Sequence, residues 1–380
     1  MTSPKILFIV NVDTFFVSHR LPVALASKAK GFEVNIACSV TKYNELMLAH
    51  GLAVHSLNLD RRSHGLLANT MTFFQILKVI WKVKPDLIHL VTIKPLILGG
   101  LAARLMRIPG VIAAISGLGY VFTAPGLISR IRRFLVVSIY RWLFRHPNIT
   151  VIIQNEEDGE ILRKKCGLVS EKSVLIRGSG VDLEQYVELD NIADPPLIVF
   201  ASRLLASKGV REFVEAARIL KQSRVNARFI VIGDCDAGNP ESVAEAEVKS
   251  WSVEQTIEWW GFRDDIPSIL SSCYLVVFPS YYGEGVPKIL IEAAASGKAI
   301  VTTDHAGCRD AVEANISGLI VPVKDVKALV QAIEYLLNDK RLCKKMGKAG
   351  RRFAELHFDI SEVVLKHIGI YDHLLMAARR

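Results

Sequence analysis

The sequence predicts an α/β protein with two doubly wound parallel-sheet domains, and three observations support this. The chain has 380 residues, which is more than one hydrophobic core usually organises. Short apolar runs alternate with helix-like segments, as they do in β-α-β units. This alternation stops once, in a polar segment that ends in two prolines (187–196), and then starts again. We therefore expect domains at 1–188 and 189–358, and a C-terminal helix at 359–380 that is able to pack back on the first domain.

Apolar segments predict the strands of the first domain, at 5–12, 32–39, 86–92, 110–117 and 150–156. A helix is expected over Leu21–Lys30, between the first two strands. The strands are too apolar to have a face in water, so they fit a parallel sheet that helices cover on both sides.

Further apolar segments predict the strands of the second domain, at 196–203, 227–234, 256–261, 274–280, 298–304 and 318–323. Each is followed by a helix or a turn, as in the first domain. In doubly wound sheets, ligands bind at the carboxyl ends of the strands. Two such domains facing a central cleft would therefore hold a ligand between them.

Composition excludes several classes of protein. Hydrophobic residues make up 51% and charged residues 22% of the chain, which is typical of a folded globular protein. The six cysteines are scattered without metal-binding spacing, as is usual in a reducing compartment. The apolar run Ile6–Val10 is too short for a signal peptide, and no apolar run reaches the ~18 residues of a membrane-spanning helix. We expect a cytoplasmic protein that can still touch a membrane surface.

Charge is divided unevenly along the chain. Residues 1–150 contain 18 Lys and Arg against 5 Asp and Glu, whereas the remaining residues contain 29 against 33. A basic half joined to a slightly acidic half indicates that one domain faces an anionic surface or ligand. Nucleic acid is a poor candidate for that partner, because no recognition motif and no interleaved exposed aromatic residues accompany the basic residues.

Two glutamates eight positions apart stand out in the segment Tyr281–Gly297, YYGEGVPKILIEAAASG. Pro287 suits the first position of a helix that is apolar on nearly all sides, so Glu292 should be buried within that helix. A buried carboxylate needs hydrogen-bond donors, which a nearby arginine, a loop or the hydroxyl groups of a bound ribose would supply. Glu284 lies in the glycine-flanked loop before the helix, where we expect it to accept from a ligand hydroxyl group.

A second group of candidate residues is basic. Arg203 and Lys208 follow the predicted strand at 196–203, in the loop before a helix. Two cations at the carboxyl end of a strand suit a diphosphate, and a solvated basic loop is the alternative. Asp234 and Asp236 also follow a strand, but neither a histidine nor a third carboxylate is spaced to complete a metal site, so we expect no metal there.

The segment FPSYYGEGVPKILIEAAASGKAIVTTD (278–304), together with Arg203, Lys208 and the turn GSGVD (178–182), resembles the retaining glycosyltransferases of family four, which have the GT-B fold. The similarity runs from about residue 5 to about residue 355 and is densest in the second half. It implies two Rossmann-like domains that face a central cleft. It also implies a nucleotide-sugar co-substrate, most simply a UDP-sugar, and no metal or other cofactor.

The resemblance implies a role for each matching residue. Glu284 would contact hydroxyl groups of the donor sugar and Glu292 the nucleotide ribose, while Arg203 and Lys208 would stabilise the departing diphosphate. Further donor contacts are implied for Gly285, Val286, Pro287, Arg263 and Gly180. Transfer would retain the configuration of the sugar, through attack on the same face, with the leaving phosphate helping to deprotonate the acceptor.

The first half departs from the commonest pattern of the family. Asn11–Asp13 stands where many members have a Gly-Gly loop, and Ser116 stands where many have a histidine. Both replacements resemble the subgroup that extends undecaprenyl-diphosphate-linked glycans, as does HLVTIKP at 89–95. Ser116, Asp13 and His19 are therefore candidates for the acceptor side, although a histidine just before a helix is often a structural cap.

The segment GLISRIRRFLVVSIYRWLFRH (126–146) indicates how the basic half is used. On a helix, Arg130, Arg133, Arg141 and Arg145 fall within about a third of the circumference, while most other positions are apolar or aromatic. Such a helix either lies in the interface of an anionic bilayer or is an internal helix whose arginines reach the solvent. The uneven charge and the lipid-linked acceptor favour the membrane interpretation.

The function expected from these residues is that of a retaining, metal-independent hexosyltransferase. It would move an N-acetylhexosamine or hexose from a UDP-sugar to an undecaprenyl-diphosphate-linked saccharide. The protein would be attached peripherally to the cytoplasmic face of the inner membrane, in bacterial surface-polysaccharide or glycoprotein-glycan assembly. Two alternatives stay open: a nucleotide-sugar epimerase of the same fold, and a non-catalytic nucleotide-sugar-binding protein.

Overall fold

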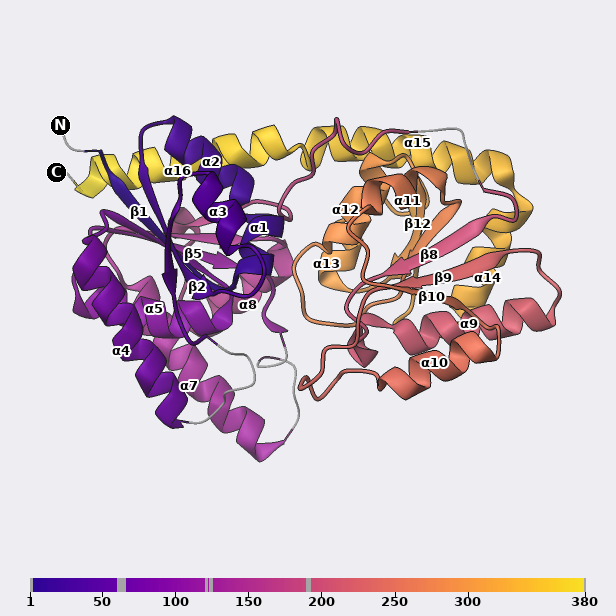
Figure 1. Ribbon diagram of the computed structural model, residues 1–380, viewed down its shortest axis with the longest axis horizontal. Helices are drawn as coiled ribbons and strands as arrows, with labels where there is room; N and C mark the ends of the chain where they lie inside the picture. Colours follow the sequence, from indigo (N-terminus) through magenta and orange to yellow (C-terminus); the bar gives the residue numbers. More distant parts are fainter. Residues whose placement is uncertain (1–2, 60–65, 120–121, 123–125, 189–192, 379–380) are drawn as a thin grey trace. The chain divides into compact units, whose positions relative to one another are not determined.

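The structure is a computed structural model that describes residues 3–59, 66–119, 122, 126–188 and 193–378. The chain divides into two compact units, Met1–Ser179 with Ser361–Arg380, and Gly180–Ile360. Each unit contains one parallel sheet, and Figure 1 shows helices on both sides of each sheet. The predicted class, two doubly wound parallel-sheet domains, is confirmed.

The first unit has a seven-stranded sheet in the order β3-β2-β1-β4-β5-β6-β7. Its strands are β1 (Lys5–Val12), β2 (Glu33–Ser39), β3 (Ala53–Ser56), β4 (Leu87–Val91), β5 (Gly110–Ile115), β6 (Ile149–Ile153) and β7 (Ser173–Leu175). Its helices are α1 (Asp13–His19), α2 (Leu21–Ala29), α3 (Asn44–Ala49), α4 (Leu66–Val83), α5 (Ile93–Leu105), α7 (Leu127–Phe144), α8 (Glu156–Cys166) and α16 (Ile360–Ala378).

The second unit has a six-stranded sheet in the order β10-β9-β8-β11-β12-β13. Its strands are β8 (Leu197–Ala201), β9 (Arg228–Ile232), β10 (Glu258–Gly261), β11 (Leu275–Phe278), β12 (Ala299–Thr303) and β13 (Gly318–Val321). Its helices are α9 (Val210–Gln222), α10 (Glu245–Val253), α11 (Ile266–Ser272), α12 (Lys288–Ala295), α13 (Ala306–Arg309), α14 (Val326–Asn338) and α15 (Lys340–His357).

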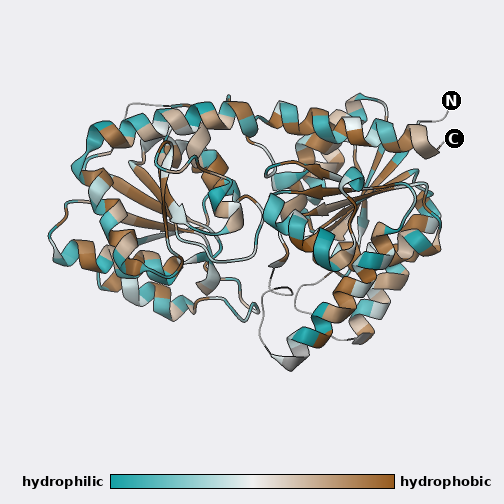
Figure 2. Ribbon diagram, turned by 180° about the vertical axis from the view of Figure 1, so that it is seen from behind, coloured by the Kyte–Doolittle hydropathy of each residue, from teal (hydrophilic) through white to brown (hydrophobic). Residues whose placement is uncertain are grey.

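All the predicted strands are present, and most of them are apolar segments buried on both faces of their sheet, whereas β10 is half-buried throughout. Figure 2 shows this pattern: most strand segments are brown, whereas the helices alternate brown and teal. Two strands were missed, β3 and β7, which form the outer edges of the first sheet. Their sequences, AVHS and SVL, are short and partly exposed, so they lack the continuous apolar run that identified the others.

The division between the units falls before Gly180, whereas the sequence placed a boundary at 188/189. Residues 180–188 lie with the second unit because the Val181 N–H donates to the carbonyl of Phe358 at 2.8 Å, and Tyr186 packs in the second core. The polar segment at 187–196, which suggested the boundary, is partly outside the described residues. The segment at 187–196 thus belongs to the second unit and does not mark its first residue.

The C-terminal helix α16 is held against the first sheet by buried polar groups. The Tyr371 hydroxyl lies 2.7 Å from Nδ1 of His89 on β4, and both side chains are fully buried. Burial lowers the pKa of His89 well below its usual value and that of His367 on α16 to about 3, so both imidazoles stay neutral near pH 7. Arg20 is also buried beside them, with its Nη1 donating to the carbonyl of His19.

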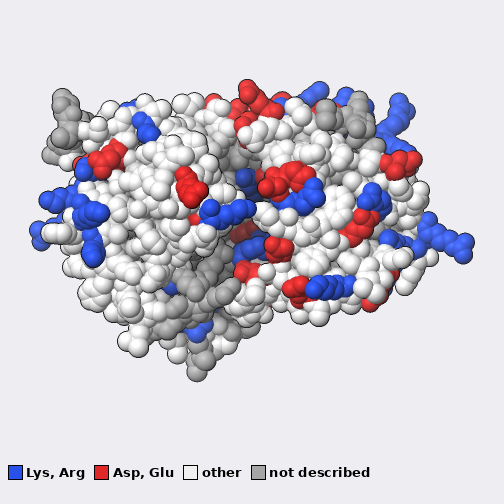
Figure 3. Space-filling view, in the orientation of Figure 1, with Lys and Arg blue, Asp and Glu red and all other residues white. Residues whose placement is uncertain are grey.

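The charge asymmetry of the sequence is visible on the surface. On the face shown in Figure 3, blue and red side chains are interspersed over the second unit. The part of the first unit near α4 shows Lys and Arg but no Asp or Glu on the same face.

Candidate functional site

Two loops of the second unit meet at the carboxyl edge of its sheet. They follow β8 and β11, which are neighbouring parallel strands. Gly209 ends the first loop with φ +81°, and a Cβ there would lie 2.2 Å from the carbonyl oxygen of Pro279 in the second loop. The Tyr281 N–H also donates to the carbonyl of Ser207 at 2.9 Å. Only glycine allows this close approach, which places Lys208 against the segment that contains Glu284.

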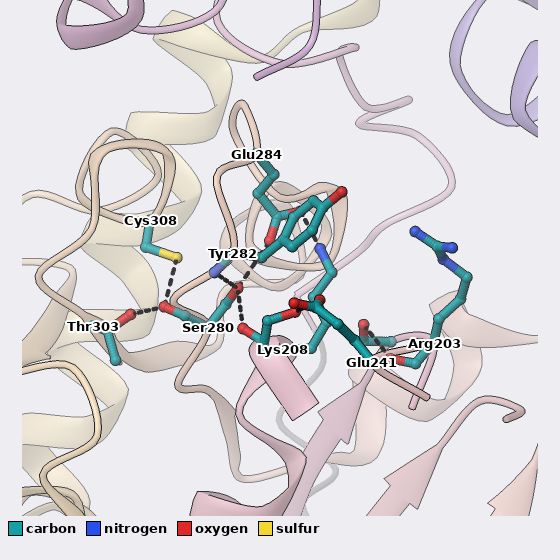
Figure 4. Close-up of polar contacts among 10 residues, drawn as sticks. Arg203, Lys208, Glu241, Ser280, Tyr282, Glu284, Thr303 and Cys308 are labelled. Carbon is teal, nitrogen blue, oxygen red and sulfur yellow. Dashed lines mark hydrogen bonds and ion pairs between the residues drawn. The ribbon is translucent and has the colours of Figure 1, made fainter. Parts of the chain in front are cut away.

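Lys208 and Glu284 form an ion pair that is largely withdrawn from water (Figure 4). Their side chains are 9% and 17% exposed. The Lys208 ammonium also lies 4.8 Å from the ring centroid of Tyr282 and 5.6 Å from that of Phe278. Ser280 lies 3.0 Å from the second carboxylate oxygen of Glu284. The pair therefore combines opposite charges, aromatic faces and a hydroxyl group in one small site.

Hydrogen bonds and close packing fix the backbone around Ser280. Thr303, at the end of β12, donates its hydroxyl to the Ser280 carbonyl, and the Tyr282 N–H donates to the Ser280 hydroxyl at 3.2 Å. On the other side, a Cβ at Gly307 would lie 1.9 Å from the carbonyl oxygen of Gly285. These contacts hold the Glu284 loop in one conformation, so the carboxylate is pre-positioned.

Arg203 has a different partner from Lys208. Its Nη1 lies 2.6 Å from Oδ2 of Asp236, and the two side chains are 43% and 30% exposed. In Figure 4, Arg203 lies on the far side of Lys208 from Glu284. Asp236 thus neutralises a cation. Within the described residues, no group of three His, Cys, Asp or Glu side chains is arranged to hold a metal ion.

Glu292 is buried in α12, as the sequence indicated, and its partners are a tyrosine and a lysine. The Tyr186 hydroxyl donates to Oε1 at 2.8 Å, and Nζ of Lys288 lies 3.6 Å from the same oxygen. Burial raises the pKa of Glu292, and Lys288 and Tyr186 oppose that shift without cancelling it. The sequence left open a pairing with an arginine, a loop or a ribose; among the residues that the structure describes, Glu292 is given no arginine partner.

The remaining donor-side candidates are Gly180, Arg263, Gly285, Val286 and Pro287, and they all lie in the second unit. Val286 is buried, and Pro287 precedes the first residue of α12. Gly285 leads into that helix, and Gly180, with φ +77°, opens the second unit. Arg263 lies apart, in the turn after β10, where it forms a two-pronged ion pair with Asp265 at 2.7 and 2.5 Å.

The acceptor-side candidates all lie in the first unit. Asp13 is buried at the end of β1, and its carboxylate accepts from the backbone N–H groups of Thr41, Lys42 and Tyr43 at 2.7–2.8 Å. Burial opposes ionisation of Asp13, but these hydrogen bonds and that of the Thr41 hydroxyl keep its pKa below the usual value. Asp13 thus fixes the loop after β2, and this bonding is what the structure shows for it.

His19 and Ser116 differ from Asp13 in their surroundings. His19 ends α1, where its ring stacks on Phe15 at 4.0 Å between centroids and its Nδ1 lies 2.5 Å from the Ser18 hydroxyl. Ser116 directly follows β5 and is half-buried, at the same carboxyl edge as Asp13. The sequence placed His19 before α2, and the short helix α1 that it closes was not predicted.

The arginines of α7 do not form a uniform basic stripe. Arg130 and Arg145 are exposed, and Arg133 is half-buried. Nε of Arg141 donates to the carbonyl of Lys165 on α8 at 2.9 Å, so this side chain links two helices. Within the described residues, no helix is long and apolar enough to cross a membrane.

Sequence reasoning missed Tyr186, Ser280 and Asp236 as partners of the site residues. Tyr186 contacts a residue 106 positions away, which no local pattern can indicate. Ser280 lies inside the segment 278–304 that carries the family resemblance, only four positions before Glu284, and this closeness was a signal that could have been used. Asp236 was considered only as a metal ligand, and its pairing with Arg203 depends on the adjacency of β8 and β9.

Comparison with known proteins adds independent findings. The model for "Glycosyl transferases group 1" matches residues 184–353, and the model for "Glycosyl transferase 4-like" matches residues 5–156. Together the two matches cover most of the chain, one in each half. The segments singled out above, with Glu284, Glu292, Arg203 and Lys208, lie within the first of these matches.

Similar proteins align along nearly the whole chain. The N,N'-diacetylbacillosaminyl-diphospho-undecaprenol alpha-1,3-N-acetylgalactosaminyltransferase of Campylobacter jejuni is 29% identical over 98% of this chain and 99% of its own. The UDP-Gal:alpha-D-GlcNAc-diphosphoundecaprenol alpha-1,3-galactosyltransferase of Escherichia coli is 24% identical over 82% of this chain and 81% of its own. The crystal structure of Anabaena HepE in complex with UDP and glucose superposes with a TM-score of 0.78 at 19% identity, over 97% of this chain and 99% of that one, which supports the fold.

The burial of Glu292 predicts a pH-dependent difference in stability. Because the folded state raises the pKa of this carboxyl above 4.5, the folded protein binds the proton more tightly than the unfolded chain, and its free energy of unfolding falls as pH rises through that window. Glu292→Gln removes this titration. We expect the variant to gain stability relative to the wild type as pH rises above about 4.5, measured by urea unfolding.

The matched control is Glu334→Gln, on an exposed position of α14. Its difference from the wild type should vary much less with pH. A Glu292→Gln difference that is constant with pH, or that decreases as pH rises, would contradict the burial argument.

Proposed function

The chain belongs to the group 1 glycosyl transferases, family four, of the GT-B fold, and from this premise we propose that it transfers a sugar from UDP to an undecaprenyl-diphosphate-linked saccharide. The transferred group is an N-acetylhexosamine or a hexose, and its configuration is retained. The product serves bacterial surface-polysaccharide or glycoprotein-glycan assembly. The observation that carries the proposal is the Lys208–Glu284 pair at the carboxyl ends of β8 and β11.

The choice of substrates is supported by the two relatives. Both are named for acting on a saccharide linked to undecaprenol through a diphosphate, and one of them matches this chain almost from end to end. The Escherichia coli relative is named for a UDP-linked donor. The same pair of substrate classes is the simplest assignment for this chain.

Lys208 and Arg203 would bind the donor diphosphate. The Lys208 ammonium has three N–H groups, so it can keep its contact with Glu284 and still donate to a phosphate oxygen. Arg203 is half-exposed and has five N–H groups. It can therefore donate to Asp236 and to a phosphate at the same time, or replace its contact with Asp236 by one with a phosphate. Two positive charges at this position would stabilise the diphosphate as it leaves, without a metal ion.

Glu284 would hold hydroxyl groups of the donor sugar. Its carboxylate is already neutralised by Lys208 and contacted by Ser280, which suits an acceptor of hydrogen bonds better than a nucleophile. Attack by the acceptor on the same face as the leaving phosphate then gives retention, and that phosphate takes the proton. Glu284 positions the sugar, and the phosphate does the proton transfer.

Glu292 would hold the nucleotide ribose. Among the described residues, the contacts of Tyr186 and Lys288 both fall on Oε1. Oε2 is then the oxygen that accepts from the ribose hydroxyl groups. Arg263 and its turn, with Gly285–Pro287 and Gly180, complete the proposed donor site around the base and the diphosphate.

Acceptor binding is assigned to the first unit, and membrane attachment to α7. Ser116 and Asp13 lie at the carboxyl edge of the first sheet, with His19 at the end of the adjoining helix. Attachment is proposed to be peripheral, at the cytoplasmic face of the inner membrane, because the lipid anchor of the acceptor lies in the bilayer. Arg130, Arg141 and Arg145 are exposed and would approach anionic headgroups, with the half-buried Arg133 beside them.

Incubation of the protein with a panel of nucleotide sugars and extracted lipid-linked acceptors tests this function. We expect one UDP-sugar to be consumed, and NMR of the extended glycan to show the anomeric configuration of the donor. An epimerised nucleotide sugar without transfer would instead identify an epimerase. Donor binding with neither transfer nor slow hydrolysis would identify a binding protein, and consumption of no donor would contradict the proposal.

Separate roles for the two glutamates predict separate kinetic effects. Glu292→Ala should weaken UDP binding by about tenfold or more, because it removes a charged acceptor of ribose hydroxyl bonds. Glu284→Ala should leave UDP binding nearly unchanged and lower kcat by about 10²-fold, because it loses contacts to the transferred sugar. Calorimetry with UDP and steady-state kinetics measure the two effects, with the exposed Glu334→Ala as control. Equal losses of UDP binding in both variants would contradict the assignment.

A further inference from the structure

Three neighbouring helices cover one side of the first sheet. Helix α5 contacts α4 on one flank and α7 on the other, and both views of the molecule place the three together (Figures 1 and 2). Because all three lie on the same side of one sheet, the surfaces that they turn away from it form one continuous outer face. We call this the α4–α7 face.

The outer side of α4 is apolar along its whole length. Its exposed apolar residues are Leu67 (82% exposed), Met71 (62%), Phe74 (62%) and Trp81 (70%). At 100° per residue these positions form one stripe, which also contains Lys78, and its length is about 21 Å. The inner side buries Ile76 and Ile80, so the helix already has a complete attachment to its own core. The outer stripe is therefore surplus to folding.

The outer side of α7 continues this surface. Ile131, Phe134, Leu135 and Trp142 are exposed, while Val136, Tyr140 and Leu143 are buried on the opposite side. The guanidinium of Arg104, near the end of α5, lies 4.9 Å from the Trp142 ring. Leu105 beside it is 63% exposed. Large exposed apolar side chains thus occur on all three helices, and such a patch is unusual on a protein that meets only water.

The charges on these helices have one sign. By sequence, α4, α5 and α7 contain eight Lys and Arg and no Asp or Glu. Arginines also flank the apolar stripe of α7, at Arg130, Arg132 and Arg145. A face that combines aromatic and aliphatic side chains with cations alone matches an anionic bilayer, whose interior accepts the former and whose headgroups attract the latter.

We propose that the α4–α7 face is a two-helix membrane-docking surface, in which the apolar stripe of α4 inserts into the lipid interface beside that of α7. The exposed aromatic residues enter the boundary between headgroups and acyl chains, and Lys78 extends along the stripe to keep its ammonium among the phosphates. This extends the proposed attachment through the α7 arginines. In this proposal, insertion of the apolar side chains contributes most of the affinity for the bilayer, and the cations give the preference for anionic lipid.

A second copy of the same chain is a less suitable occupant. Pairing two such faces would bring the exposed cations of one copy, among them Lys78, Lys82, Arg130 and Arg132, against those of the other, and α4, α5 and α7 contain no acidic residue to neutralise them. Like charges at that density oppose association at moderate ionic strength. The bilayer supplies the missing negative charge, so it is the occupant to which the inference commits.

Vesicle binding tests the proposal without donor or acceptor, so its outcome is independent of sugar transfer. The probes are vesicles of phosphatidylcholine with phosphatidylglycerol, and the variant is Phe74→Ser/Trp81→Ser. We expect its partition coefficient to fall about tenfold or more, because two large apolar side chains leave the lipid. The matched control is Val253→Ser/Leu356→Ser, which changes two apolar residues of the second unit that are at least as exposed (82% and 75%) and should bind like the wild type.

Further readouts separate insertion from charge attraction. In the wild type, lipids brominated on the acyl chain should quench tryptophan fluorescence, and Trp81→Phe should reduce that quenching. Lys78→Glu/Lys82→Glu should weaken binding to anionic vesicles more than binding to phosphatidylcholine alone. Unchanged partition of Phe74→Ser/Trp81→Ser would overturn the proposal. So would a wild-type dimer in solution that this variant converts to a monomer, because the face would then be a protein interface.

Discussion

The buried ion pair between Lys208 and Glu284 is the interaction on which the second unit's site depends. Two charges that are mostly withdrawn from water are tolerated only when each neutralises the other and further polar groups complete their bonding. Ser280 contacts the carboxylate, and the aromatic faces of Tyr282 and Phe278 lie beside the ammonium. The glycine at position 209 permits this arrangement, because any side chain there would collide with the Pro279 carbonyl. The pair thus joins the ends of two neighbouring strands into one positioned group.

The partners of a buried charge also distinguish Glu284 from Glu292. Glu284 is paired with the Lys208 ammonium, and its oxygens can accept from hydroxyl groups. Glu292 has a tyrosine and a more distant lysine, and burial raises its pKa. The two glutamates are hydrogen-bond acceptors with different partners, which suits contacts with two different parts of one nucleotide-sugar donor. In the first unit, the Asp13 carboxylate accepts hydrogen bonds from the loop after β2. The helices α4, α5 and α7 of this unit carry the basic and apolar surface.

Much of this arrangement was predictable from the sequence, because it depends on local patterns. The central strands are continuous apolar runs, and such runs are unambiguous when both faces of a sheet are covered. Glu284, Glu292 and Lys208 were identified for the same reason, since their spacing and their place after strands are local. The edge strands β3 and β7 were not, because short and half-exposed strands carry no such run.

Contacts between distant segments could not be predicted. Tyr186 reaches Glu292 across the chain, and Asp236 takes Arg203 only because β8 and β9 are paired. The helical wheel of α7 showed its arginines, but not which apolar residues face outward. Which apolar residues of a helix face outward depends on which side of the helix packs on the sheet. This holds for α4 as well as for α7.

The central claim is that Lys208 and Glu284 act as one unit in the donor site, and a double-mutant cycle on kcat/KM for the donor tests it most directly. Each single change to alanine leaves the partner's charge buried and unpaired, so the double variant should lose at least about 1 kcal/mol less transition-state stabilisation than the sum of the single losses. Losses that add to within about 0.5 kcal/mol would show that the two side chains act independently, and would contradict the account.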